Sequence, residues 1–174
     1  MARLSLFDFP DPVNEVSARL VAGGVVLMAV VVVFGAQYWL IAPLAYGFVA
    51  RVLTGPTLSP LGQLVTRVIT PLLRLDPRLV PGPPKRFAQA IGATLSVGAA
   101  IAHFGFGETG SATILVAFIL VAASLEAFVG FCLGCWLFAR LMAVGVIPAT
   151  VCERCADVSD RSTLPPSREA KLLT

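Results

Sequence analysis

The sequence predicts an all-α membrane protein with four transmembrane helices arranged as two helical hairpins. Of its 174 residues, 57% are hydrophobic and only 13% are charged, and this balance excludes an ordinary soluble domain. The apolar residues are also grouped into runs close to the roughly 20 residues that a transmembrane helix needs. The predicted spans are residues 20–36, 38–52, 87–106 and 112–131.

The first two spans form a predicted hairpin, because only a short turn around Gln37 separates them. We expect Asp11 to cap the first helix and Pro12 to occupy its first position. Acidic and proline residues precede this helix in place of a basic segment, so we expect it to be retained and not cleaved as a signal. Small residues such as Gly24 and Gly47 predict that the two helices pack closely together.

Residues 53–86 form a long loop that contains an amphipathic segment. Six apolar residues recur there at helical spacing, and arginines follow on the remaining positions. Such a pattern is typical of a short helix lying in the membrane interface. Pro71 is expected to end or kink it. The six apolar residues are Leu61, Leu64, Val65, Val68, Ile69 and Leu72.

The fourth segment is too long for a single straight span. The chain stays largely apolar from residue 112 to residue 145, about 50 Å of helix against a hydrocarbon core of about 30 Å. We therefore predict a bent, extended fourth helix, with the bend at Gly130 or Gly134. The chain is then expected to fold back after Pro148. Residues 1–157 form one predicted membrane domain, and residues 158–174 a disordered cytoplasmic tail.

The distribution of basic residues predicts the orientation. The turn around Gln37 and the turn at residues 105–110 contain no Lys or Arg, so all 13 basic residues lie on the other side. The positive-inside rule then places both termini and the 53–86 loop in the cytoplasm, in a multi-pass protein of the inner (plasma) membrane. This topology and the anionic lipid bilayer account for the net charge of +3 without a nucleic-acid partner.

The four cysteines are the residues with the clearest chemical potential. They form two C-x-x-C pairs, Cys132 with Cys135 and Cys152 with Cys155. This spacing brings two sulfurs together for a disulfide or for one metal ion. Thiol–disulfide exchange or sulfur relay between the pairs is the favoured hypothesis, since cytoplasmic paired cysteines are usually catalytic or metal-binding. A non-enzymatic scaffold with a four-cysteine zinc site is the first alternative, and inert cysteines remain a third possibility.

Within the redox hypothesis the cysteines are expected to play different roles. Arg154 lies inside the second pair, and a nearby cation lowers a thiol pKa, so Cys152 or Cys155 is the expected exposed nucleophile. A new helix opening near Gly134 would favour a thiolate at Cys135. Cys132 is then the expected buried member of the first pair.

Glu126 is the one ionisable residue inside the fourth span. An intramembrane carboxylate suggests a functional site, so a small transporter subunit with Glu126 lining a path is the second alternative. A structural ion pair with a cytoplasmic-side arginine, Arg51 or Arg86, is the favoured interpretation. His103 lies near the other end of the third span, too far along the bundle for a joint site with Glu126.

Several segments together carry a family resemblance. They are residues 10–15 (Pro-Asp-Pro-Val-Asn-Glu), Gly55-Pro56, Ser59-Pro60, residues 84–89 (Pro-Lys-Arg-Phe-Ala-Gln), and the ending with Glu126, the two C-x-x-C pairs and Pro148. In this combination the chain resembles, over residues 7 to about 157, an actinobacterial membrane family known as domain of unknown function number 4395. The resemblance implies a place near thioredoxin-like and rhodanese-type sulfurtransferase proteins. A cytoplasmic protein of either type is therefore the expected partner.

Overall fold

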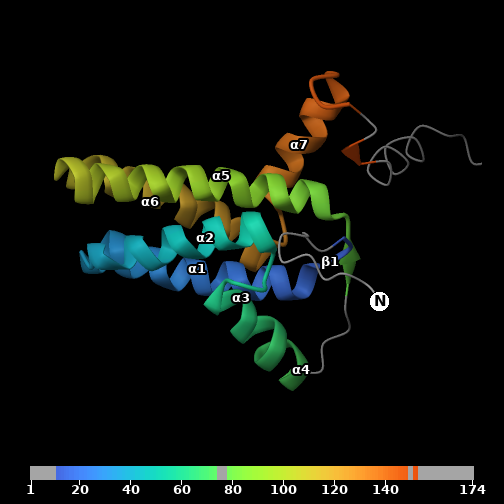
Figure 1. Ribbon diagram of the computed structural model, residues 1–174, viewed down its shortest axis with the longest axis horizontal. Helices are drawn as coiled ribbons and strands as arrows, with labels where there is room; N and C mark the ends of the chain where they lie inside the picture. The colour runs from blue at the N-terminus through green and yellow to red at the C-terminus, as the bar shows by residue number, and fades with distance from the viewer. Residues whose placement is uncertain (1–10, 74–77, 149–150, 153–174) are drawn as a thin grey trace, which may run out of the picture.

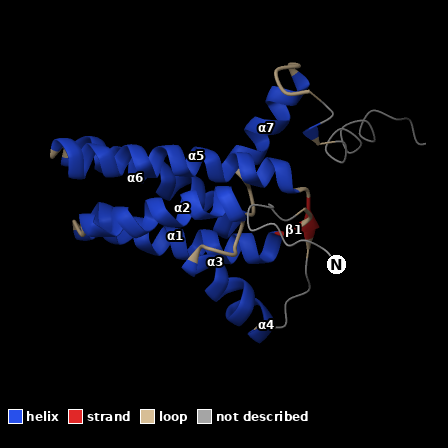
Figure 2. Ribbon diagram, viewed as in Figure 1, coloured by secondary structure: helices blue, strands red, loops and turns tan. Residues whose placement is uncertain are grey.

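The computed structural model describes residues 11–73, 78–148 and 151–152, and these residues are almost entirely helical (Figures 1 and 2). The helical fold class is thereby confirmed. η1 is a 3-10 turn, and η2, η3 and η4 are single π-helical turns that continue neighbouring α-helices. The elements in order are β1 (Val13–Asn14), α1 (Glu15–Gly35), η1 (Tyr38–Leu40), α2 (Ile41–Thr54), α3 (Pro60–Leu64), η2 (Val65–Ile69), α4 (Thr70–Leu72), β2 (Leu79–Val80), α5 (Gly82–Ala100), η3 (Ile101–Gly105), α6 (Thr109–Ser124), η4 (Leu125–Val129) and α7 (Leu133–Ala143).

Among the described residues, three helices are long and apolar enough to cross a membrane. They are α1 (Glu15–Gly35), α5 with η3 (Gly82–Gly105) and α6 with η4 (Thr109–Val129). The predicted span at residues 38–52 corresponds to a shorter apolar helix, Tyr38–Thr54. Large apolar side chains such as Leu27, Phe34 and Phe118 are exposed on these helices. So wide an apolar surface supports a lipid-facing exterior.

The helices pair across the two hairpins and not within the first one. α1 packs on α6, and α2 packs on α5, while α1 and α2 contact each other at few points. The predicted close packing of the first two helices is therefore wrong. The small residues allow other close contacts. A Cβ on Gly24 would lie 2.7 Å from the side chain of Leu61, and a Cβ on Gly47 would face Arg51 and Ser59. The buried centre is made of small and β-branched residues, including Val25, Ala29, Val32, Ile41, Leu44, Ala99, Val116 and Ile119.

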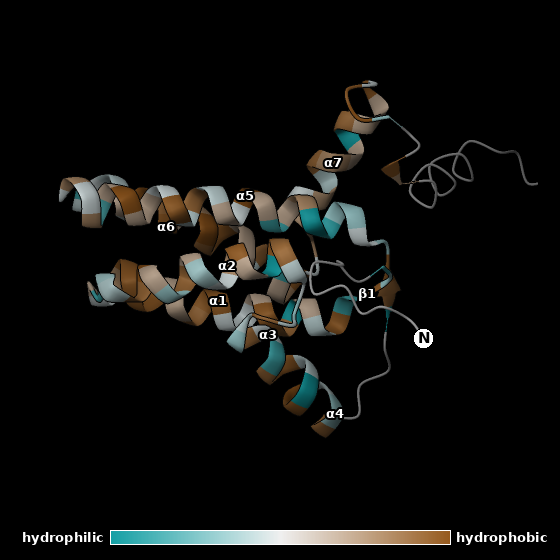
Figure 3. Ribbon diagram, viewed as in Figure 1, coloured by the Kyte–Doolittle hydropathy of each residue, from teal (hydrophilic) through white to brown (hydrophobic). Residues whose placement is uncertain are grey.

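The two ends of the bundle differ in character. The α1–α2 turn and the α5–α6 turn lie together at one end, whereas β1 and α7 lie toward the other (Figure 1). Hydrophilic residues gather at the end that carries β1 and α7 (Figure 3). The candidate site described below is at this second end.

A short strand pair ties the start of α1 to the start of α5. β1 and β2 are antiparallel, with Val13 opposite Val80 and Asn14 opposite Leu79. Asn14 is the N-cap of α1, and its side chain accepts a hydrogen bond from the backbone N of Val16 at 3.0 Å. The expectation that Asp11 caps α1 is wrong, because the strand separates them.

Asp11 instead serves the helix that follows β2. Its Oδ1 accepts a hydrogen bond from the backbone N of Gly82 at 3.1 Å, at the first turn of α5. A carboxylate is favourable there because the first N–H groups of a helix have no intrahelical partner.

The predicted amphipathic helix is present as α3, η2 and α4, which follow one another without interruption. Val65 is 1% exposed, whereas Leu64, Val68 and Leu72 are each at least 50% exposed. The helical segment ends at Leu72, one residue beyond Pro71, in line with the prediction that Pro71 ends or kinks it. A π-helical turn precedes Pro71, in which the backbone N of Thr70 bonds to the carbonyl of Val65, and the wider turn accommodates a proline that offers no N–H.

The fourth segment bends where the sequence predicts. η4 ends at Gly130, whose φ of 75° is a left-handed conformation that glycine adopts without strain. The backbone is extended at Cys132, and α7 then leaves in a new direction (Figure 1). Beyond α7, Val151 lines a hollow with Phe87 and Phe138, so the chain returns to α5. Cys155 and the predicted tail at 158–174 lie outside the described residues.

Candidate dithiol site

Cys132 occupies the N-cap of α7. Its backbone is extended, with φ of −88° and ψ of 103°, and its Sγ accepts a hydrogen bond from the backbone N of Cys135 at 3.4 Å. The positive end of the α7 dipole therefore faces Cys132, where it stabilises a thiolate. The prediction that the new helix favours Cys135 is wrong, because α7 begins at Leu133, earlier than the Gly134 expected from the sequence.

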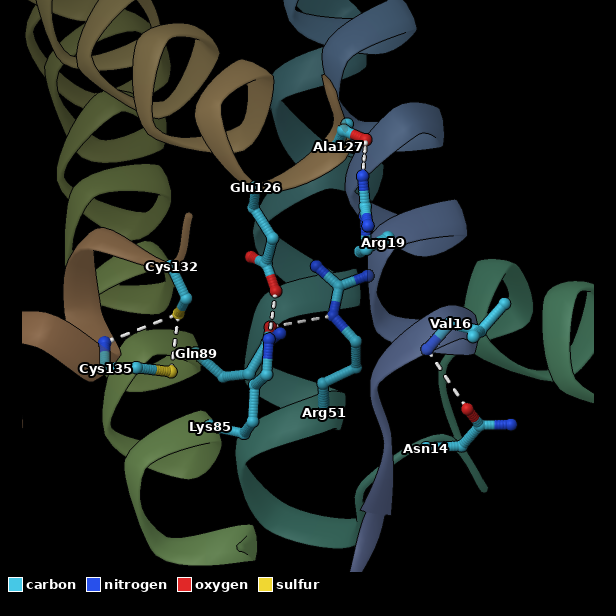
Figure 4. Close-up of polar contacts among 10 residues, drawn as sticks. All are labelled: Asn14, Val16, Arg19, Arg51, Lys85, Gln89, Glu126, Ala127, Cys132 and Cys135. Carbon is cyan, nitrogen blue, oxygen red and sulfur yellow. Dashed lines mark hydrogen bonds and ion pairs between the residues drawn. The ribbon is translucent and has the colours of Figure 1, made fainter. Parts of the chain in front are cut away.

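The two sulfurs of the first pair are in direct contact. Cys135 donates its thiol hydrogen to Cys132 Sγ across 2.6 Å (Figure 4). Both residues are free thiols and half-buried. The pair is thus arranged for formation of an internal disulfide, and it remains accessible to a partner.

The hydrogen bond between the two thiols shifts their pKa values in opposite directions. The thiol hydrogen bond from Cys135 lowers the pKa of Cys132, and the positive charge of Lys85 acts in the same direction against burial and Glu126. The pKa of Cys135 is raised, first because its thiol donates this hydrogen bond and second because it is buried. Cys132 is therefore the more acidic thiol of the pair, and Cys135 the less acidic one.

Close contact between α7 and α5 places the pair beside Lys85. A Cβ on Gly134 would lie 2.5 Å from Cβ and 2.6 Å from Cα of Ala88, so only glycine permits this approach. One turn further, the rings of Phe138 and Phe87 contact each other with centroids 5.6 Å apart.

Lys85 and Glu126 form a buried ion pair behind the cysteines. Nζ of Lys85 lies 2.6 Å from Oε1 of Glu126, and the two side chains are 9% and 16% exposed. The predicted ion pair for Glu126 is confirmed, but its direct partner is Lys85 and not Arg86; the charge of Glu126 also acts on Arg51. Successive residues of a helix point about 100° apart, so Lys85 faces η4 whereas Arg86 is exposed and donates to the carbonyl of Val52 at 3.1 Å.

Arg51 adds a second buried cation to this cluster. It is 6% exposed, its Nε donates to Oε1 of Gln89 at 3.0 Å, and its guanidinium lies over the ring of Phe48 at 4.5 Å. The cluster therefore contains two buried cations, Lys85 and Arg51, and the carboxylate of Glu126. A thiolate at Cys132 would offset the excess positive charge.

Arg19 holds the turn that carries Glu126. Its guanidinium donates to the carbonyl of Ala127 at 3.4 Å (Figure 4) and to that of Phe128 at 3.5 Å, at the end of η4. Carbonyls at a helix C-terminus have no partner within the helix. This contact fixes the direction in which the chain leaves the bundle toward Cys132.

The second cysteine pair is not joined to the first within the described residues. Cys152 is 5% exposed and disulfide-bonded, whereas Cys132 and Cys135 are free thiols. Of the two residues predicted as the exposed nucleophile, Cys152 is therefore buried, and Cys155 lies outside the described residues. In the described part of the chain, no three Cys, His, Asp or Glu side chains are grouped to hold a metal ion. His103 packs its ring on Tyr38 and Phe104, with centroids 4.9 Å apart in both cases.

The model of the family named Domain of unknown function (DUF4395) matches residues 13–143. The chain belongs to this family. The DUF4395 region contains Lys85, Glu126, Cys132 and Cys135, and it ends before Cys152. No curated protein and no solved structure matches the chain. Within the DUF4395 region, the sequence offered one unused signal for the site: Lys85 and Gln89 are four residues apart and so share a helix face with Gly92.

Proposed function

We propose that this protein is an integral membrane thiol–disulfide exchange protein whose working pair is Cys132 and Cys135. The observation that carries the proposal is the first turn of α7, where Cys132 Sγ lies at a helix N-cap, 2.6 Å from Cys135 Sγ. The Lys85–Glu126 ion pair lies behind it. A thiolate nucleophile next to a protonated second thiol is the arrangement that exchange chemistry needs.

The proposed reaction proceeds through a mixed disulfide. The Cys132 thiolate attacks one sulfur of a partner disulfide, forms a bond to it and releases the other sulfur as a thiolate. Cys135 then loses its proton and attacks Cys132 Sγ, which closes the Cys132–Cys135 disulfide and frees the second partner sulfur. Two thiols are oxidised and one disulfide is reduced. All steps are reversible.

Sulfur relay is a variant of the same chemistry. The Cys132 thiolate attacks the outer sulfur of a partner persulfide and releases the partner thiolate, so Cys132 carries the sulfur as its own persulfide. No electrons are gained or lost in this step. Attack by Cys135 on Cys132 Sγ would then release the carried sulfur as sulfide and leave a disulfide. A thioredoxin-like protein fits the first reaction and a sulfurtransferase the second.

The second pair is proposed to pass electrons between the partner and the first pair. Its support is the difference in oxidation state, since Cys152 is disulfide-bonded while Cys132 and Cys135 are thiols. Transfer between two such pairs needs only exchange of one disulfide for another. A zinc scaffold has less support, because a disulfide-bonded sulfur is not a thiolate ligand. A transporter role also has less support, since Glu126 is committed to Lys85 at 2.6 Å.

The proposed topology has four spans, with both termini and the α3–η2–α4 segment on the cytoplasmic side of the inner membrane. The hydrophilic end of the bundle supports it, as does the absence of Lys and Arg from both opposite turns. Helix Tyr38–Thr54 is near the lower limit of about 17 residues for a span. Reporter fusions at Gln37 and Glu108 are expected to lie outside; a cytoplasmic signal at either one would eliminate the four-span arrangement.

Trapping of the mixed disulfide tests the proposed chemistry. The Cys135→Ser variant lacks the attacking thiol of the second step, so incubation with oxidised glutathione should accumulate a glutathione adduct on Cys132. The wild-type protein should yield the Cys132–Cys135 disulfide, and Cys132→Ser should form no comparable adduct on Cys135. Peptide mapping by mass spectrometry identifies each product. Equal adducts on Cys132 and Cys135 in the two variants would contradict the assigned roles.

A further inference from the structure

A cavity of about 180 Å³ lies between the helices directly beside Cys132. Its walls come from α1, α2, α5, α6 and α7 and are mostly apolar. On α1 they run from Ala18 to Val25, and on α5 from Ala88 to Leu95, about 10 Å of helix rise in each case. The cavity thus extends from the dithiol into the apolar interior of the bundle.

The end of the cavity near Cys132 is polar. Glu126 and Gln89 line it together with Cys132. Oε1 of Gln89 accepts from Arg51, and within the described part of the chain its amide nitrogen donates no hydrogen bond. The amide hydrogens of Gln89 therefore provide hydrogen-bond donors at the same end of the cavity as Cys132.

These features define the chemistry of an occupant. An apolar protein cavity of about 150 Å³ accepts a benzene ring, so a cavity of about 180 Å³ accepts one ring with small substituents. Acceptor oxygens on that ring would bind at the polar end of the cavity, and a hydrocarbon tail would fill its elongated apolar part. The neighbouring dithiol calls for a group that takes up two electrons. A membrane-soluble quinone meets all four requirements.

We propose that this cavity binds the head group of a membrane quinone, which oxidises the Cys132–Cys135 dithiol. The proposal rests on the proposed exchange function and names the acceptor of its electrons. The two thiols give up two electrons and two protons and form one sulfur–sulfur bond. The quinone takes up both electrons and both protons, and its two carbonyl oxygens become hydroxyl groups. Electrons then pass from a cytoplasmic thiol partner through the cysteines to the membrane pool.

Anaerobic titration of the reduced protein with a benzoquinone that carries a decyl tail tests this proposal. Loss of quinone absorbance should match disulfide formation, with one quinone consumed for each disulfide formed, the Cys132–Cys135 disulfide included. Ala122 lines the cavity and Val121, its neighbour, is 61% exposed on the outside of the same helix. Ala122→Phe should lower the rate of quinone reduction by about tenfold or more, because the ring fills the cavity. Val121→Phe is the matched control and should leave the rate unchanged.

Exchange with oxidised glutathione, measured in parallel, separates this proposal from the proposed function. Intact glutathione exchange with no quinone reduction in the wild-type protein would overturn the quinone site alone. So would an equal effect of Ala122→Phe and Val121→Phe. Loss of both reactions in the wild-type protein would overturn the exchange function itself. If Ala122→Phe does not fold, Ala122→Leu should give a smaller but selective loss of quinone reduction.

Discussion

Replacement of Gly134 by alanine is expected to push α7 away from α5 and to weaken the thiolate at Cys132. The added Cβ would lie 2.5 Å from Cβ and 2.6 Å from Cα of Ala88, against the 3.4 Å at which ordinary contact begins. The shortfall is about 0.9 Å, and neither atom of Ala88 can rotate away. Overpacking of this kind costs about 1–3 kcal/mol, and alanine regains about 0.5–1 kcal/mol within a helix. The net loss of unfolding free energy is therefore between about 0 and 2.5 kcal/mol, with a midpoint of about 1 kcal/mol.

Thermal unfolding in detergent and the rate of Cys132 alkylation by iodoacetamide measure the two effects. Both should fall in Gly134→Ala, because Cys132 moves away from Lys85 as α7 retreats. Gly23→Ala is the control: nothing lies within 4 Å of the added Cβ, so its stability should be equal or slightly higher. A Gly134→Ala protein with unchanged unfolding temperature and unchanged Cys132 alkylation would refute the packing argument.

Variants of three other residues test the charges and the cap. Lys85→Met should raise the pKa of Cys132 and slow its alkylation at neutral pH, because Lys85 lowers that pKa. Glu126→Gln should lower the pKa of Cys132 and shift its alkylation profile to lower pH, since Glu126 raises that pKa. If Lys85→Met and Glu126→Gln shift the pKa of Cys132 in the same direction, the electrostatic account is refuted. Glu126→Gln should also lose about 3–5 kcal/mol of stability, because Lys85 is left unpaired. Asp11→Ala should lower stability by about 0.5–2 kcal/mol, and Asp11→Asn, which keeps an acceptor for Gly82, should lose less; equal losses would argue against the cap.

Some features of this fold follow from the length of the apolar runs and from the spacing of the apolar residues. The apolar run after residue 112 is longer than a membrane is thick, so a bend is required, and Gly130 is the residue that adopts the necessary left-handed backbone. The helical character of residues 60–72 likewise follows from apolar spacing, although the π turn before Pro71 does not.

Other features depend on how the helices are rotated against one another. The partner of Glu126 is Lys85 and not Arg86 because the two residues point about 100° apart on α5, and the sequence does not state which side faces η4. The thiolate is assigned to Cys132 because the extended backbone after Gly130 starts α7 at Leu133. The pairing of α1 with α6 arises from tertiary packing, which adjacency in the chain did not predict.

The order in which the two thiols of the first pair react is the most direct test of the account. The reduced protein is treated with limiting iodoacetamide over a range of pH, and the modified peptides are quantified by mass spectrometry. We predict that Cys132 is alkylated first, with a pH midpoint below that of an ordinary thiol, because the Cys135 hydrogen bond and Lys85 stabilise its thiolate. Alkylation of Cys135 first, or equal alkylation of both at the pH of an ordinary thiol, would contradict the assignment of Cys132 as the nucleophile.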